Sequence, residues 1–234
     1  MKKIFSQIYT GLFTVCLFLL CGFIAIMIPA NSRDFYKWQF EKNDTVELVR
    51  SQYVYLDGEG RDYIENITEE QTLDLMQHVM RYCLFLEDDM NITVDGQYLE
   101  LFTENELSHM KDVRGVFGGG LIIVLISFIV VVAGIVLAII FRKGYWENCR
   151  KIPYYVFGGI IALFALLAIL IACDFQKAFQ IFHMIFFTGN WTFSNGVMIS
   201  MIGYIFTDIV WIIALGWVFF TAIRNISSSK KSLI

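Results

Sequence analysis

The chain has 234 residues, of which 57% are hydrophobic, 16% aromatic and 17% charged, and its formal net charge is −4. Such a composition excludes a soluble globular protein. Four apolar runs, at residues 9–30, 117–141, 153–173 and 198–223, each reach the length of about 20 residues that crosses the hydrocarbon core of a membrane. The sequence therefore predicts an α-helical polytopic membrane protein with four transmembrane helices.

Lysine and arginine near the ends of these runs predict the orientation, because cytoplasmic segments are enriched in both. They gather before the first run, between the second and the third, and after the fourth. We therefore expect residues 1–30 to form the cytoplasmic N-terminus and a retained first span, followed by a mixed α/β extracytoplasmic cap at 31–116. The second span is expected at 117–141, a cytoplasmic loop at 142–152 and the third span at 153–173. An outer interfacial helix and loop are expected at 174–197, the fourth span at 198–223 and a cytoplasmic tail at 224–234. Both termini of this multi-pass protein then lie on the cytoplasmic side of the cell membrane.

The cap contains several short-range signals. Residues 53–56 precede Asp57-Gly58, a pattern that predicts a short strand and a turn. Thr68 and Gln71 form a capping box, which predicts a helix from residue 68 to the acidic residues 87–89. Residues 91–99 read as a strand and a turn. Cys83 is the one cysteine of this segment, so the cap is expected to fold without an internal disulfide.

A second capping box, Thr103 with Glu106, predicts the start of the helix that carries His109. The glycines at 115 and 118–120 are expected to loosen the junction between this helix and the second span. Asp112 follows His109 by three residues, so the two side chains share a helix face, and the carboxylate is placed to orient the imidazole. A solvated histidine with a chance acidic neighbour is the alternative reading.

The stretch from Asp174 to Trp191 is too polar to be a span, although it lies between two of them. Its phenylalanines at 175, 179, 182 and 186 recur every three or four residues and so line one face of a helix. Asp174 suits the N-cap of this helix and Gly189 its end. His183 lies within the aromatic face, which is typical either of a catalytic imidazole in a water-poor site or of an interfacial histidine with a structural role.

His109 and His183 each lie just outside a predicted span, on the same predicted side of the membrane. A four-helix bundle is narrow, so both histidines are expected to approach one site at the boundary between cap and membrane. His78 is interpreted as a structural residue of the cap. Asp208 lies near the middle of the fourth run, where burying a carboxylate in the membrane costs free energy. It is interpreted either as a functional residue or as a structural one whose partner is a hydroxyl such as that of Tyr204 or Thr207.

Two stretches, one around His109 and one around His183, are similar to those of the Lit family, the bacterial lipoprotein intramolecular transacylases. The first contains Glu106, His109, Met110 and Asp112, and the second contains Asp174, Phe179, Phe182, His183, Phe186, Phe187 and Trp191. The four predicted spans, the long segment between the first two spans and the overall length also resemble this family.

The resemblance implies an acyltransferase that moves the sn-2 acyl chain of a lipoprotein's diacylglyceryl group onto the α-amino group of its N-terminal cysteine, which gives a lyso-form lipoprotein. It implies that His109 and His183 are catalytic and that an aromatic pocket at the outer leaflet binds the substrate, lined by Phe179, Phe182, Phe186, Phe187 and Trp191. The expected partners are diacylglyceryl lipoproteins and membrane lipid, with no nucleic acid. Transfer from an ester to an amide runs downhill, so no nucleotide, metal or other cofactor is expected.

Two other functions fit parts of the sequence. A non-catalytic four-span sensor or interaction protein would share the spans and the outer segment. A different interfacial enzyme of acyl chains, such as a lipid hydrolase, would share the aromatic pocket. The second class normally uses a serine nucleophile or a closely spaced His-Asp motif. No serine of this chain lies in a nucleophile-elbow setting, and the sequence disfavours both alternatives.

Overall fold

The computed structural model describes residues 2–140, 149, 151–187, 197 and 201, and these residues are mostly helical. They divide into two compact units. The first is built from residues 1–24 and 109–191, and the second mainly from residues 25–108. Of the predicted fourth span only residue 201 is described, and Gly189, Trp191 and Asp208 fall outside the described residues.

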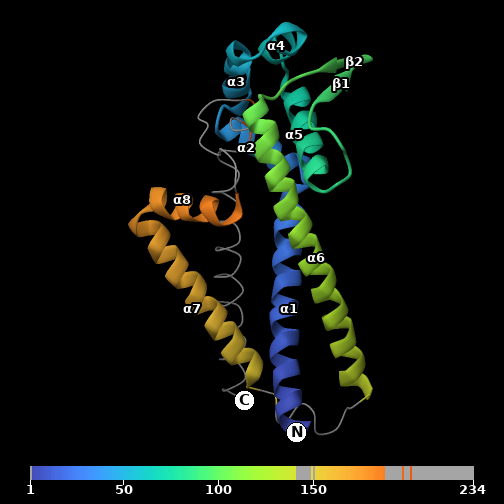
Figure 1. The fold of residues 1–234 in the computed structure, drawn as a ribbon, viewed down its shortest axis with the longest axis vertical. Helices are drawn as coiled ribbons and strands as arrows, with labels where there is room; N and C mark the ends of the chain where they lie inside the picture. Colours follow the sequence, from blue (N-terminus) through green and yellow to red (C-terminus); the bar gives the residue numbers. More distant parts are fainter. Residues whose placement is uncertain (1, 141–148, 150, 188–196, 198–200, 202–234) are drawn as a thin grey trace, which may run out of the picture. The chain divides into compact units, whose positions relative to one another are not determined.

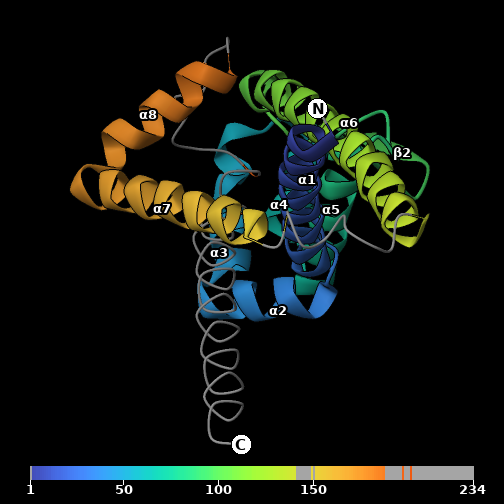
Figure 2. The same ribbon diagram turned by 90° about the horizontal axis from the view of Figure 1, so that it is seen from below.

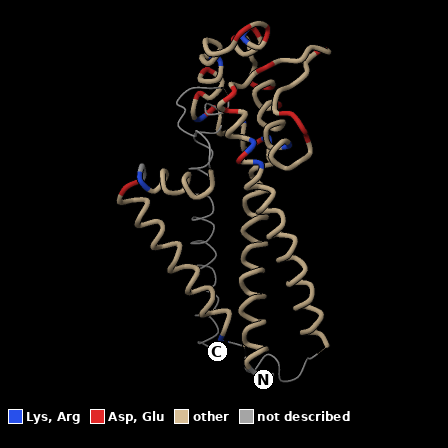
Figure 3. Tube along the Cα trace, in the orientation of Figure 1, with Lys and Arg blue, Asp and Glu red and all other residues tan. Residues whose placement is uncertain are grey.

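Among the described residues, three helices have the length and apolar composition of membrane spans. They are α1 (Lys2–Ala30), α6 (Glu104–Ile140) and α7 (Ile152–Cys173) (Figure 1). Their apolar stretches carry no Asp, Glu, Lys or Arg, whereas these residues are frequent on the elements of the second unit (Figure 3). This part of the chain is therefore a multi-pass membrane structure, as the composition predicts.

The prediction that the glycines loosen the junction before the second span is wrong, because α6 is one continuous helix through residues 115 and 118–120. The predicted boundary between cap and span, at 116 and 117, lies inside it. At 1.5 Å per residue a helix of this length extends about 55 Å, well beyond the ~30 Å of hydrocarbon. Since residues 117–140 suffice to cross the membrane, His109 belongs to the part of α6 that precedes the crossing.

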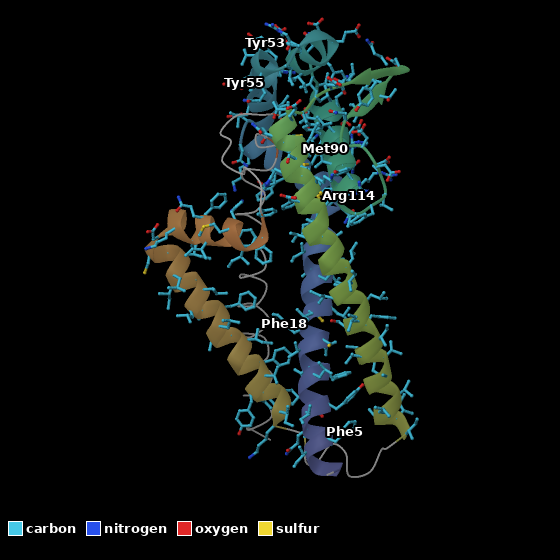
Figure 4. The ribbon with its side chains drawn as sticks, in the orientation of Figure 1. Phe5, Phe18, Tyr53, Tyr55, Met90 and Arg114 are labelled. Atoms are coloured by element: carbon cyan, nitrogen blue, oxygen red, sulfur yellow. The ribbon has the colours of Figure 1, made fainter. Side chains whose placement is uncertain are left out.

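Within the first unit, α1 lies between α6 and α7 (Figure 2). The Tyr9 hydroxyl donates to the carbonyl oxygen of Val130 on α6, at 3.0 Å. On the opposite side, Phe18 points towards α7 (Figure 4), where its ring centroid lies 6.4 Å from that of Phe157 and 6.1 Å from that of Phe164. The short helix α8 (Phe175–Phe186) follows α7 after Asp174.

The second unit is a small helical domain with one hairpin. It contains α2 (Arg33–Lys42), α3 (Thr45–Arg50), the 3₁₀ helix η1 (Ser51–Tyr55), α4 (Gly58–Glu65), α5 (Glu69–Cys83), β1 (Ile92–Val94) and β2 (Gln97–Leu99). Its core is formed by buried side chains from these elements, among them Tyr36, Phe40, Val49, Ile64, Leu73, Met76, Val79 and Leu101.

Several local predictions for this unit are confirmed. Thr68 and Gln71 make both hydrogen bonds of a capping box at the start of α5. Residues 91–99 contain the antiparallel hairpin of β1 and β2, with Val94 opposite Gln97. Asp95 and Gly96 join the strands with φ of 52° and 83°, the left-handed pair that a tight hairpin turn requires.

Two local predictions are wrong. Residues 53–56 do not form a strand: they belong to η1 and its end, where the Leu56 N–H donates to the carbonyl oxygen of Tyr53 at 3.2 Å. Asp57 is the N-cap residue of α4 and Gly58 is its first residue, so the predicted turn is replaced by the start of a helix. In addition, α5 ends at Cys83, before the acidic residues 87–89.

Candidate active site

The capping box at the start of α6 sets the position of His109. The Glu106 carboxylate accepts a hydrogen bond from the Thr103 N–H at 3.0 Å, and the Thr103 hydroxyl accepts one from the Glu106 N–H at 3.3 Å. Glu106 is fully buried, so this start of the helix is well defined. His109 follows one turn later and is half-buried.

His183 lies in the last turn of α8 and is 9% exposed. The helix begins as predicted, because the Asp174 side chain accepts a hydrogen bond from the Lys177 N–H at 3.0 Å. It ends at Phe186, and the predicted end residue Gly189 lies outside the described residues. The start at Asp174 thus fixes the helical register that places His183 on the aromatic face.

The His183 ring is held by its own helix. Its Nδ1 lies 2.9 Å from the carbonyl oxygen of Phe179, one turn earlier. A carbonyl oxygen only accepts hydrogen bonds, so Nδ1 carries the proton and donates it. In the neutral ring the lone pair is then on Nε2, the nitrogen that can take a proton from another group.

The two imidazoles lie side by side in the first unit. Their ring centroids are 6.2 Å apart and their planes are inclined by only 17°. Phe187, just after α8, is close to both rings, at 4.9 Å from His109 and 5.2 Å from His183. Two imidazoles this close to each other can act on the same substrate group, as acid–base catalysis by a pair of groups requires.

The surroundings of His109 favour its neutral form. Burial lowers the pKa of His109 below its ordinary value, and the neighbouring His183 lowers it further, while the Asp112 carboxylate raises it. Asp112 therefore acts on this imidazole through its charge from one turn along α6.

Phenylalanines surround His183 on several sides. The Phe179 ring centroid is 4.0 Å from the imidazole centroid, and the Phe182 ring lies 5.5 Å away in an edge-to-face arrangement. Phe186 packs on Phe182 at 4.8 Å. Phe179, Phe182 and Phe186 are each nearly half exposed. These rings can keep water from the imidazole and still offer apolar surface to an acyl chain.

The sequence model of the family described as "Lipoprotein intramolecular transacylase Lit" matches residues 11–206, which is most of the chain and includes both histidines. The chain belongs to the Lit family. No curated protein sequence matches it. The family name gives the coarse function, a transacylase that processes lipoproteins, and this Lit protein shares the membrane-integral character of its structural relatives.

Three solved structures of the membrane-integral lipoprotein intramolecular transacylase Lit from Bacillus cereus have a similar fold. One, at 16% identity, gives a TM-score of 0.61 and covers 98% of this chain and 99% of that chain. A variant with one histidine replaced by alanine gives 0.63 at 15% identity, covering 100% and 98%. A variant with a histidine replaced by arginine gives 0.61 at 14% identity, covering 100% and 96%. At such low identities the likeness shows the fold.

His78, interpreted as structural, donates from Nε2 to the carbonyl oxygen of Asp89 at 2.9 Å and lines a pocket of about 560 Å³ in the second unit. Trp191 and Asp208 lie outside the described residues. The hydrogen bond from His183 to the carbonyl oxygen of Phe179 was not predicted from the sequence, although the spacing of four residues within a helix could have indicated it.

Proposed function

We propose that this Lit protein moves the sn-2 acyl chain of a diacylglyceryl lipoprotein onto the α-amino group of the N-terminal cysteine, and that His109 and His183 catalyse the transfer. The observation that carries the proposal is the pair of near-parallel imidazoles with ring centroids 6.2 Å apart, both in contact with Phe187. The family supports a lipoprotein transacylase in general, and the histidine pair supports this particular chemistry.

The reaction needs one group to remove a proton and another to supply one. The amine nitrogen attacks the ester carbonyl, the N–C bond forms, the C–O bond to the glyceryl oxygen breaks, and that oxygen leaves with a proton. We assign the base to His183, because its Nδ1–H is committed to Phe179 and its Nε2 carries the lone pair. His109 stabilises the oxyanion through its N–H and gives that proton to the glyceryl oxygen, while its other nitrogen takes up the proton that His183 removed from the amine, so both imidazoles end neutral.

The enzyme's other contribution is position. The acyl donor and the amine acceptor belong to one lipoprotein molecule, so holding them close turns a rare encounter into a favoured one. The phenylalanines around His183 limit the access of water, which would otherwise hydrolyse the ester. Asp112, on the same helix face as His109, orients the His109 imidazole. We place the site at the outer leaflet and both termini in the cytoplasm, which rests on the distribution of Lys and Arg.

The experiment uses the three histidines of the chain. His109→Gln, His183→Gln and His78→Gln are expressed in cells that lack the activity, and the N-terminal peptide of a reporter lipoprotein is analysed by mass spectrometry. The first two variants are expected to give no lyso-form lipoprotein at a normal level of inserted protein. His78→Gln serves as the matched control and keeps the activity. Lyso-form product from either of the first two variants removes that histidine from the mechanism.

A further inference from the structure

The end of α5 is an unusual helix terminus. The Leu86 N–H donates to the carbonyl oxygen of Arg81 at 2.9 Å, and the Phe85 N–H donates to that of Tyr82 at 3.2 Å. These two bonds define a Schellman motif, in which the residue at the Phe85 position adopts a left-handed backbone. Phe85 has a φ of 63°. Glycine is the usual residue there, because a side chain makes this conformation costly.

The motif turns two large apolar side chains towards the outside of the second unit. Phe85 is 50% exposed and Leu86 is 62% exposed. In a Schellman motif the residue at the Leu86 position frequently makes a hydrophobic contact with the residue at the Arg81 position. Here that partner is a charged arginine and not an apolar residue. Arg81 is engaged elsewhere, with its Nη2 2.8 Å from Oε1 of Glu87. Leu86 therefore keeps most of its surface available for another apolar environment.

The turn lies at the end of the second unit where α1 completes its apolar span. The Tyr36 hydroxyl donates to the carbonyl oxygen of Ala30, the last residue of α1, at 2.5 Å. Tyr36 is also close to Cys83: burial raises the pKa of Tyr36, and the neighbouring Cys83 raises it further. Cys83 is the last residue of α5. α5 points this end towards residues 25–30 of α1 (Figure 1).

Charge limits how far the turn can enter a membrane. Glu87, Asp88 and Asp89 follow Leu86 directly, and carboxylates do not enter hydrocarbon without a large cost. The exposed apolar surface is thus confined to two residues beside an acidic stretch. Such a surface fits the shallow, glyceryl level of a bilayer with zwitterionic headgroups, and a strongly anionic surface would repel the three acids.

We propose that the turn formed by Phe85 and Leu86 is a membrane-contact site, with the lipid at the bilayer interface as its partner. It gives the second unit a second attachment to the bilayer besides its covalent link through α1. The inference does not depend on the proposed reaction, and it holds for either orientation of the chain, because the turn and the end of α1 lie on the same side.

The test places an environment-sensitive fluorophore on Leu86→Cys in the full chain, with the two exposed cysteines, Cys21 and Cys173, replaced by serine. The protein is reconstituted in phosphatidylcholine nanodiscs that contain doxyl-labelled phosphatidylcholine as a quencher. The matched control is Val54→Cys, a position that is 54% exposed. It lies between Tyr53 and Tyr55, at the end of the second unit opposite residues 25–30 (Figure 4).

Quenching at position 86 is expected to exceed that at position 54 several-fold, and the emission at 86 to be shifted to shorter wavelength. Adding Phe85→Gly should reduce the quenching at 86, while the turn is kept because glycine is favoured at this position. Equal quenching at 86 and 54 would overturn the proposal. Emission at position 86 that is shifted to shorter wavelength but not quenched would also overturn the proposal, because the apolar environment of Leu86 would then be protein and not lipid.

Discussion

Gly60, in the first turns of α4, is predicted to be the most sensitive glycine of the second unit. A Cβ at this position would lie 2.4 Å from the carbonyl oxygen of Glu100 and 3.3 Å from its carbonyl carbon, whereas real Cβ contacts essentially never fall below 3.0 Å. Both partners are backbone. Gly60→Ala therefore forces α4 away from the segment that precedes α6, which carries His109.

The magnitude follows from two opposing effects. Overpacking of this kind costs about 1–3 kcal/mol of unfolding free energy. Replacing a helical glycine by alanine returns roughly 0.5–1 kcal/mol, because the unfolded chain loses less freedom. The net expectation is a loss of about 1–2 kcal/mol. For a chain of this size, 1 kcal/mol shifts Tm by about 2–4 °C, so Tm should fall by about 2–8 °C.

The assay is thermal unfolding of the purified protein in nanodiscs, followed by tryptophan fluorescence at one fixed scan rate, because membrane proteins often unfold irreversibly. Gly115→Ala is the control, since a Cβ at Gly115 in α6 meets no atom within 4 Å. The control should be unchanged or more stable. If Gly60→Ala unfolds at the same temperature as Gly115→Ala, the close approach to Glu100 is not a real constraint.

Three further predictions concern the candidate active site. Asp112→Asn removes the group that raises the pKa of His109, so the limb of the pH–rate profile that belongs to His109 should move to lower pH; a limb that stays in place or moves up contradicts the assignment. Phe187→Ala should lower stability by roughly 1–2 kcal/mol and increase ester hydrolysis relative to transfer, because water reaches both imidazoles. The comparison is Phe186→Ala, and an equal ratio of free fatty acid to lyso-form product in both would refute the role of Phe187. Asp174→Asn should keep substantial activity, since asparagine caps helices as well as aspartate does; complete loss at a normal protein level would show that the carboxylate has another role.

Features that depend on a few neighbouring residues were predictable from the sequence. The capping boxes at Thr68 and Thr103, the N-cap at Asp174 and the hairpin turn at residues 95–96 each involve partners within three or four residues. The long apolar helices were predictable for a similar reason, because length and composition alone decide whether a helix can span a membrane.

The errors come from segments whose conformation depends on distant partners. The aromatic and β-branched residues at 53–55 favour a strand, but a strand needs a neighbour to pair with, and η1 instead closes its hydrogen bonds locally. The glycines of α6 favour a break, but the helix continues because its apolar surroundings leave backbone groups no better partner than one another.

The candidate site was predictable as a set of residues, and its geometry was not. The positions of His109 and His183 near span ends indicated that they meet. Their separation and the common contact with Phe187 depend on how the chain reverses at Asp174, between α7 and α8. No short-range signal in the sequence specifies that reversal.

The hydrogen bond from His183 to Phe179 closes within a single helical turn. The direction of Nε2, the nitrogen of the proposed base, is therefore set by α8 itself and does not depend on a neighbouring element. If α8 tilts or slides to admit a bulky lipidated substrate, the ring travels with the helix and arrives already oriented. If His183 is the base, as we propose, the entrance of the site can then adapt to the substrate without the base having to be repositioned in each cycle.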